Sequence, residues 1–269
     1  MIDLHCHMLP GLDDGPSDDA LALEMARMAK GDGIDCIACT PHFTPGVYEN
    51  TAISIQRHLS RFRRLLAQNG ITLELVIGAD IHLAPHLEKS LADGLVPTLG
   101  GSHYFLWELP HHVMPPRIEA IARTMRHSGF RPILTHPERL SWIKSHYDVF
   151  ERLHDGGVVF QVTAGSLLAH FGSAAEYWAE RLMDERRVDI LASDAHNVSS
   201  RPPVLSRARD LVARRWGEEL AMDLVGRRPA AILQDNLPRP RRGSGSLKAK
   251  AAPSRGLKRT LERLVRGRA

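Results

Sequence analysis

Short apolar runs alternate with longer amphipathic segments along the first 236 residues. Runs rich in Ile, Val and Leu predict seven strands, at residues 1–5, 34–40, 72–80, 103–109, 131–136, 158–163 and 188–194. Apolar positions at helical spacing predict helices between the strands, at residues 17–33, 51–70, 115–128, 146–155, 173–187 and 203–216. The first two helices begin at Ser/Asp and Thr cap signals and end at glycine.

This alternation of strands and helices predicts an α/β fold. Connections that are long enough to hold a helix favour parallel pairing of the strands. Strands that are apolar throughout suit a sheet that is covered on both faces. A closed barrel and an open doubly wound sheet both satisfy the pattern, and the residues at the strand ends favour the barrel.

At least six of the seven predicted strands end in a histidine, an aspartate or a glutamate. The active sites of parallel α/β folds lie at the carboxyl ends of their strands. The residues are His5, His7, Asp13, Asp14, His42, Asp80, Glu108, His136, Asp194 and His196, and the sixth strand ends in Gln161 and Thr163. Imidazoles mixed with carboxylates suit Zn, Mn or Fe, so the pattern predicts a metal site.

The remaining histidines do not follow this pattern. His58, His127, His154 and His170 are interpreted as surface or packing residues. His82, His86, His103, His111 and His112 lie near strand ends but outside the regular positions, and they are interpreted as rim residues without an assigned role.

Cys6 raises the alternative of a cysteine phosphatase, because it stands between two histidines. That mechanism needs an arginine six positions after the cysteine, and Leu12 stands there instead. Alternate residues of a strand point to the same side, so His5 and His7 can reach one ion while Cys6 points away. The C-x-x-C of Cys36 and Cys39 lies in an apolar run and is interpreted as buried strand, not as a redox pair.

Arg139 and Arg201 follow two of the candidate ligands. Guanidinium groups bind phosphate through two parallel hydrogen bonds, although either residue alone could be a solvated loop arginine. Metal ions beside arginines suggest a phosphoester substrate. The ions would generate hydroxide near neutral pH, and the arginines would stabilise the charge on the outer phosphoryl oxygens.

The charge is distributed unevenly. Residues 238–269 contain eleven Lys/Arg and one acidic residue, so residues 1–237 carry −6 although the whole chain carries +4. We therefore predict a folded domain over residues 1–236 and a basic, low-complexity, disordered tail over residues 237–269, with a short amphipathic helix at its end. Without a long apolar run or a secretory signal, the protein is expected in the cytoplasm.

Six motifs together resemble one known family. They are "HCH" at 5–7, "DDGP" at 13–16, "TPHF" at 40–43, "GAD" at 78–80, "THPER" at 135–139 and "ASDAHN" with "RPP" at 192–203. The set is similar to the PHP (polymerase and histidinol phosphatase) superfamily, in particular to its bacterial tyrosine-protein phosphatase branch of capsule and exopolysaccharide synthesis. The resemblance extends from residue 1 to about residue 236.

The resemblance implies a distorted (β/α)7 TIM-like barrel and a cluster of three metal ions. The ions are commonly manganese, with Fe, Zn, Co and Mg as other candidates. Carried over by motif, the metal ligands are His5, His7, Asp14, His42, Asp80, Glu108, His136, Asp194 and His196. Arg139 and Arg201 would bind the phosphate, and a metal-bridging hydroxide would attack phosphorus without a covalent enzyme intermediate.

The resemblance also implies a substrate, the phosphotyrosine tail of a bacterial tyrosine autokinase that controls polysaccharide assembly. The nearest alternative is a small-molecule phosphatase such as a histidinol-phosphate phosphatase. A non-catalytic module would need closed four-ligand metal sites. A PHP exonuclease would need a basic groove, so the negative charge of residues 1–237 argues against a nucleic-acid partner. Whether the protein forms a homo-oligomer is left open, because family members can form rings but this sequence shows no interface signature.

Two features depart from the family pattern. Asp80 stands where the branch usually has a glutamate that bridges two ions, so the cluster is expected to be tighter or to hold one ion weakly. The basic tail is the second, and two interpretations stay open for it. It contacts an acidic partner or a membrane surface, or it is a solvated tail without a partner.

Overall fold

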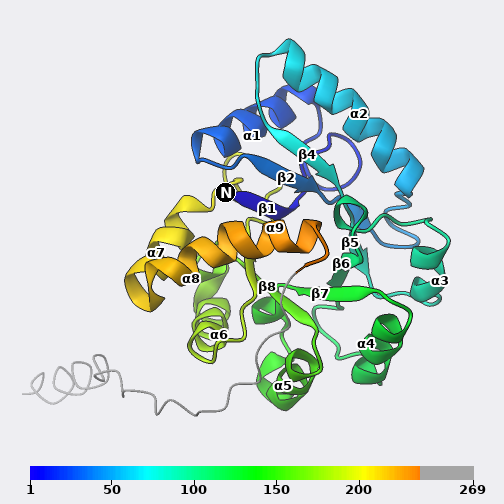
Figure 1. Ribbon diagram of the computed structural model, residues 1–269, viewed down its shortest axis with the longest axis vertical. Helices are drawn as coiled ribbons and strands as arrows, with labels where there is room; N and C mark the ends of the chain where they lie inside the picture. The colour runs from blue at the N-terminus through cyan, green and yellow to red at the C-terminus, as the bar shows by residue number, and fades with distance from the viewer. Residues whose placement is uncertain (237–269) are drawn as a thin grey trace, which may run out of the picture. The chain divides into compact units, whose positions relative to one another are not determined.

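The computed structural model describes residues 1–236, and the predicted strand regions are confirmed (Figure 1). The strands are β1 Ile2–Cys6, β2 Cys36–Cys39, β3 His42–Phe43, β4 Glu74–Ile77, β5 Asp80–His82, β6 Tyr104–Glu108, β7 Arg131–Thr135, β8 Val159–Thr163 and β9 Ile190–Ala192. All neighbouring strands pair in parallel. The second strand position is divided into β2 and β3, with β3 just beyond the predicted residues 34–40, and the third is divided into β4 and β5. The nine strands of residues 1–236 therefore fill seven positions.

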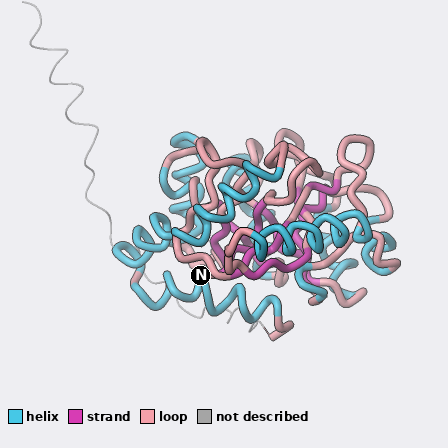
Figure 2. Tube along the Cα trace, turned by 90° about the horizontal axis from the view of Figure 1, so that it is seen from above, coloured by secondary structure: helices cyan, strands magenta, loops and turns pink. Residues whose placement is uncertain are grey.

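The seven positions follow one another in chain order around a distorted barrel. Hydrogen bonding gives two sheets, β1-β2-β4 and β3-β5-β6-β7-β8-β9. Their broken strands stay aligned, since the Asp80 amide donates to the Pro41 carbonyl. The end of β9 meets β1, because the Asp194 amide donates to the His5 carbonyl and the His7 amide to the Ala195 carbonyl. Figure 2 shows the strands in the centre with helices around them, and the predicted (β/α)7 α/β fold is confirmed.

The six predicted helices are also present. They are α1 Asp19–Gly31, α2 Ala52–Gln68, α4 Ile118–His127, α5 Tyr147–Asp155, α6 Gly172–Asp184 and α7 Ser206–Trp216. The Asp18 side chain caps α1, and Thr51 and Ser54 form a capping box on α2, as the cap signals predicted. Sequence analysis did not predict α3 Leu87–Ala92, α8 Glu218–Met222, a π-helical turn at Asp223–Arg227 or α9 Arg228–Leu233.

Two apolar clusters hold the barrel together. The larger cluster lies between strands and outer helices, where Met25 of α1 and Phe62 of α2 are fully buried. The smaller cluster joins residues near the starts of several strands, such as Leu4 and Ile190, to Ile232 of α9. In Figure 1, α9 lies across the barrel. This helix therefore covers the mouth at the amino ends of the strands and leaves the opposite mouth for the polar strand ends.

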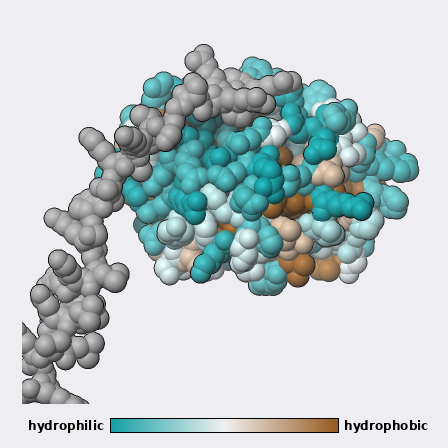
Figure 3. Space-filling view, turned by 90° about the horizontal axis from the view of Figure 1, so that it is seen from below, coloured by the Kyte–Doolittle hydropathy of each residue, from teal (hydrophilic) through white to brown (hydrophobic). Residues whose placement is uncertain are grey.

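The three cysteines are buried and free, which confirms the interpretation of Cys36 and Cys39 as strand residues. Burial raises the pKa of the Cys36 thiol to about 12 and also raises that of Cys6. Over residues 1–236, no helix combines the length and apolar character needed to cross a membrane. The face in Figure 3 is mostly hydrophilic, with a small hydrophobic area. The predicted tail of residues 237–269 lies outside the described residues.

Candidate metal centre

All nine predicted ligands converge at the carboxyl mouth of the barrel. The structure forms four overlapping groups, and the potential ligand atoms within each group lie within 4.8 Å of one another. The groups are His7-Asp14-His42-His196, His5-His7-Asp80, His42-Asp80-Glu108 and Glu108-His111-His136. Asp194 adjoins the second group, with its Oδ1 3.3 Å from His5 Nε2. Residues that are up to about 190 positions apart in sequence thus face one small volume.

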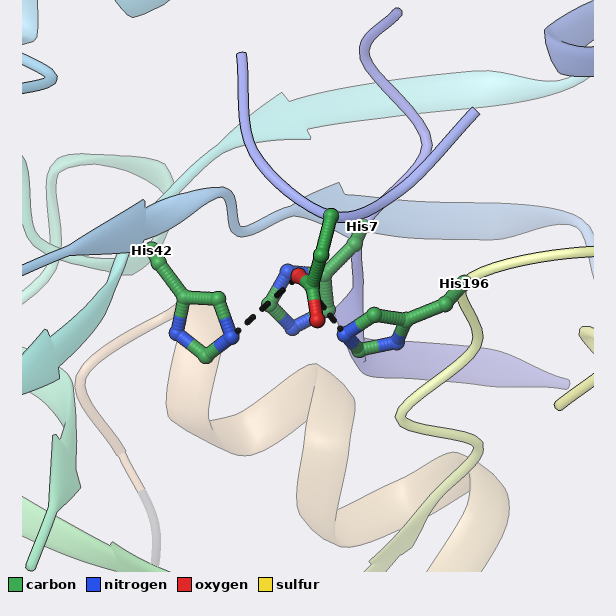
Figure 4. A group of neighbouring side chains, drawn as sticks. His7, His42 and His196 are labelled. Atoms are coloured by element: carbon green, nitrogen blue, oxygen red, sulfur yellow. Dashed lines mark ion pairs between the residues drawn. The ribbon is translucent and has the colours of Figure 1, made fainter. Parts of the chain in front are cut away.

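The first group surrounds one carboxylate oxygen. His7, His42 and His196 point toward one another in Figure 4. Asp14 Oδ1 lies 3.2 Å from His196 Nε2 and 3.5 Å from His42 Nε2. Ligands that share one ion at about 2.1 Å lie roughly 3 to 3.5 Å from one another, so these separations suit a common cation.

Two side chains behind the cluster orient its first two histidines. His5 Nδ1 lies 2.8 Å from Gln161 Oε1, and His7 Nδ1 lies 2.7 Å from Asp13 Oδ2. Both partners accept, so each Nδ1 carries the proton and each Nε2 is left for an ion. The two Nε2 atoms are 3.2 Å apart. Sequence analysis noted Gln161 at a strand end and Asp13 soon after the first strand but did not predict this orienting role.

The surroundings of the Asp80 carboxylate show whether the residues of this site fit metal ions. Its Oδ2 lies 3.4 Å from His5 Nε2 and 3.6 Å from His42 Nδ1. The side chain is fully buried, and within residues 1–236 neither oxygen accepts a hydrogen bond. A buried carboxylate without donors is costly unless a cation compensates it. Between imidazoles on both sides, Asp80 is suited to bridge two ions, so the residues present fit the metal cluster.

The electrostatic field of the mouth favours cations. Burial lowers the pKa of the His5 imidazole, but the carboxylates of Asp80 and Asp194 outweigh burial and raise the pKa to about 9. His7 shows the same balance, since Asp13 raises its pKa to about 9 against the effect of burial. Without ions, His5 and His7 therefore hold protons that bound metal ions would replace, whereas burial lowers the pKa of the His136 and His196 imidazoles, so these two are ready to bind as neutral ligands.

Arg139 and Arg201, which were predicted to bind phosphate, meet at Asp194 beside the other predicted metal ligands. Arg139 forms an ion pair with Asp194 Oδ2, and Arg201 Nη2 lies 2.6 Å from the same oxygen. Both guanidinium groups lie over the Phe171 ring, at 4.3 and 5.9 Å from its centroid. The Nε of Arg201 is buried and has no acceptor in the described part of the chain, so it is free for a phosphoryl oxygen.

The backbone at this mouth is strained at two predicted ligands. His136 has a φ of 37° and Asp194 a φ of 52°, in the left-handed region that residues other than glycine rarely adopt. Such strain costs on the order of 1–3 kcal/mol per residue and concentrates at functional sites. His136 follows β7 directly and Asp194 lies two residues after the end of β9, so the strained turns place both residues at the barrel mouth.

Three further residues at the mouth were not predicted as functional. His82 Nδ1 lies 3.4 Å from Glu108 Oε2, and His111 Nε2 lies 3.8 Å from Glu108 Oε1. Glu138 Oε1 accepts hydrogen bonds from the Thr163 amide and the Ser166 hydroxyl, which fixes the turn that carries Arg139. Glu138 lies inside the "THPER" motif, so its place near the site could be read from the sequence. Its hydrogen-bond partners, Thr163 and Ser166, could not.

Comparisons with known proteins agree with this geometry. The family described as capsular polysaccharide synthesis, CpsB/CapC, matches residues 1–234. Tyrosine-protein phosphatase YwqE of Bacillus subtilis is 33% identical over 220 residues, which cover 82% of this chain and 87% of the relative. Tyrosine-protein phosphatase CpsB of Streptococcus pneumoniae is 26% identical over 242 residues, which cover 88% of this chain and 100% of the relative.

Solved structures support the same relationship. One match comes from crystal structures of YwqE from Bacillus subtilis and CpsB from Streptococcus pneumoniae, described as unique metal-dependent tyrosine phosphatases. It has a TM-score of 0.85 and 31% identity, and it covers 89% of this chain and 97% of that chain. A lactonase from Listeria monocytogenes, with a TM-score of 0.52 and 13% identity, covers 86% of this chain and 94% of that chain and shares the fold alone. The chain belongs to the CpsB/CapC family of capsular polysaccharide synthesis, which confirms the resemblance seen in its motifs.

Proposed function

We propose that this chain is a metal-dependent protein-tyrosine phosphatase that acts on a tyrosine autokinase of capsule or exopolysaccharide synthesis. The observation that carries the proposal is the convergence of nine ligand side chains and two arginines at one barrel mouth. Relatives that are named tyrosine-protein phosphatases support it. We place the reaction in the cytoplasm, where its free cysteines stay reduced.

The metal ligands and the arginines have separate roles in this proposal. The four ligand groups overlap in a way that suits three ions, and we propose manganese. Ions bound there would supply hydroxide near neutral pH and polarise the phosphoryl oxygens. Arg139 and Arg201 hold the phosphate, and Phe171 keeps their guanidinium planes in place. Cys6 is buried with a raised pKa, so a thiolate nucleophile is not part of this mechanism.

A cavity beside Arg201 supports a peptide substrate over a small molecule. It has a volume of about 500 Å³, and its lining includes Phe171 and Arg201 as well as Leu168, Val198 and Arg207. Apolar and cationic side chains together suit residues that flank a phosphotyrosine. Histidinol phosphate would leave this surface unused, so the small-molecule phosphatase is the alternative to test.

Metal depletion and add-back test the proposed function. After chelation we expect hydrolysis of a phosphotyrosine peptide to fall to background, because the hydroxide and the charge stabilisation both depend on the ions. Manganese should restore it, and kcat/KM for the peptide should exceed that for histidinol phosphate. If Mn, Fe, Co and Zn all fail to restore hydrolysis, the proposal is wrong. Faster hydrolysis of histidinol phosphate would favour the alternative.

Asp80→Glu tests the departure from the family pattern. We expect this variant to keep or raise phosphatase activity, because a side chain that is one methylene longer still spans the gap between His5 and His42. The measurement is kcat/KM at saturating manganese together with the metal content of the protein. Asp80→Asn is the matched control, since it keeps the length and removes the charge. A loss of tenfold or more in Asp80→Glu would show that the cluster is arranged differently.

We also propose residues 1–236 as the phosphatase domain. Residues 237–269 lie outside the described residues, so contact of their basic region with an acidic partner or a membrane surface stays a prediction. The same holds for a homo-oligomer. The net charge of −6 over residues 1–237 supports the expectation of no nucleic-acid partner.

A further inference from the structure

Glu108 lies between two separate groups of imidazoles. Its Oε2 faces His42 Nδ1 at 3.5 Å and His82 Nδ1 at 3.4 Å. Its Oε1 faces His111 Nε2 at 3.8 Å and His136 Nε2 at 3.9 Å. The two oxygens of the Glu108 carboxylate therefore face different pairs of imidazoles. The pair at Oε1 consists of His111 and His136.

His111 is held in place and is not a freely solvated rim residue. Its carbonyl oxygen accepts from the Ser141 amide and the Ser141 hydroxyl, both at 3.0 Å. The preceding carbonyl, of Pro110, accepts from Trp142 Nε1 at 2.9 Å. The imidazole is 32% exposed, and its ring lies 5.2 Å from the ring of His136. The loop after β6 is thus pinned to the loop after β7 at the point where His111 faces the cluster.

The position at Glu108 and His136 needs a further donor. Asp80 contributes to two of the four ligand groups but not to the group of Glu108 and His136. Without another side chain, that position would have one imidazole and one oxygen of a shared carboxylate. His111 is placed to supply a third donor, since its potential ligand atom lies within 4.8 Å of the other two.

We propose that His111 is a metal ligand at the Glu108–His136 position and raises its affinity for zinc and ferrous iron more than for manganese. Imidazole is a softer donor than carboxylate or water, so a second imidazole favours zinc and iron over the harder manganese. The inference rests on metal binding in the proposed function, but not on the identity of the substrate.

Metal affinity tests this inference directly. In the full chain, His111→Ala should weaken zinc binding at one position by at least about tenfold and weaken manganese binding less, as measured by competition with a chelator. His112→Ala is the matched control, because His112 is the exposed neighbour and belongs to none of the ligand groups. It should bind both metals as wild type does. Equal zinc affinities for His111→Ala and wild type would overturn the inference.

A measurement on the wild-type protein covers the case in which His111→Ala does not fold. Diethylpyrocarbonate modifies free imidazoles, and mass spectrometry locates the modified residue. Zinc loading should protect His111 at least tenfold and leave His112 reactive, whereas equal modification of His111 with and without zinc would overturn the inference. Phosphatase assays of the same samples separate the two proposals. Protection of His111 without hydrolysis of any phosphoester would count against the proposed function alone.

Discussion

Replacement of Asp194 by asparagine is expected to lower kcat/KM for a phosphotyrosine peptide by at least about 10³-fold. Asp194 is 1% exposed, adjoins His5 and His7, and pairs with both arginines. The amide keeps the shape but removes the negative charge that pairs with both guanidinium groups and that would hold a metal ion. Loss of a residue behind a metal ligand already costs about 10- to 100-fold, so loss of a ligand charge should cost more. Steady-state kinetics at saturating manganese and metal analysis measure the effect.

Asp189→Asn is the matched control for this prediction. Asp189 is a buried aspartate at the opposite end of β9, where it accepts hydrogen bonds from the Phe160 amide and faces His154. Its replacement should lower the free energy of unfolding, because a buried network is weakened, while the folded enzyme keeps its kcat/KM. An Asp194→Asn variant with the same activity as Asp189→Asn would mean that Asp194 is only a structural residue.

Replacement of Arg139 by alanine should lower kcat/KM by about 10²- to 10³-fold, the usual cost of losing one donor to transition-state charge. The guanidinium stands between Asp194 and the Phe171 ring and is 17% exposed. Arg139→Lys keeps the charge but loses the planar fork, so we expect it to stay at least about tenfold below wild type. Kinetics with both a phosphotyrosine peptide and p-nitrophenyl phosphate measure the loss, which should be similar for the two because the phosphate is common to them.

Arg181→Ala controls for the loss of an arginine that lies over an aromatic ring. Arg181 lies 3.9 Å from the centroid of the Tyr147 ring, near the end of α6 that is remote from Phe171. The Arg181→Ala variant should have a slightly lower free energy of unfolding and the same kcat/KM as wild type. If Arg139→Ala also left kcat/KM unchanged, Arg139 would not be part of the phosphate site.

The strands and the gathering of the candidate ligands at one mouth could be predicted because each depends on local pattern. An apolar run predicts a buried strand wherever it occurs, and the parallel order places every strand end at one mouth. His5, His42 and Asp194 could therefore be assigned to one site before any distance was known. The breaks after Cys39 and Ile77 could not be predicted, because an apolar run has the same sequence pattern whether the strand bends or continues straight.

The residues around the ligands were harder to predict. Gln161 lies behind His5 although the two are 156 positions apart, and nothing near either one indicates the partner. His111 was grouped with other rim histidines because its position after β6 breaks the regular spacing. The structure adds the hydrogen bonds from Ser141 and Trp142 to carbonyls of its loop, which hold the loop where His111 faces Glu108.

The sequence by itself determined the α/β class, the succession of strands and helices, and the set of acidic, imidazole and guanidinium side chains at the strand ends. These features depend on residue type and spacing, which can be read directly from the sequence. The tertiary structure decided which potential ligand atoms lie close together, which nitrogen of His5 and His7 is left for an ion, and that His111 lies beside Glu108 and His136. These depend on distances across the barrel mouth, and such distances arise only when strands far apart in the chain pack around one core.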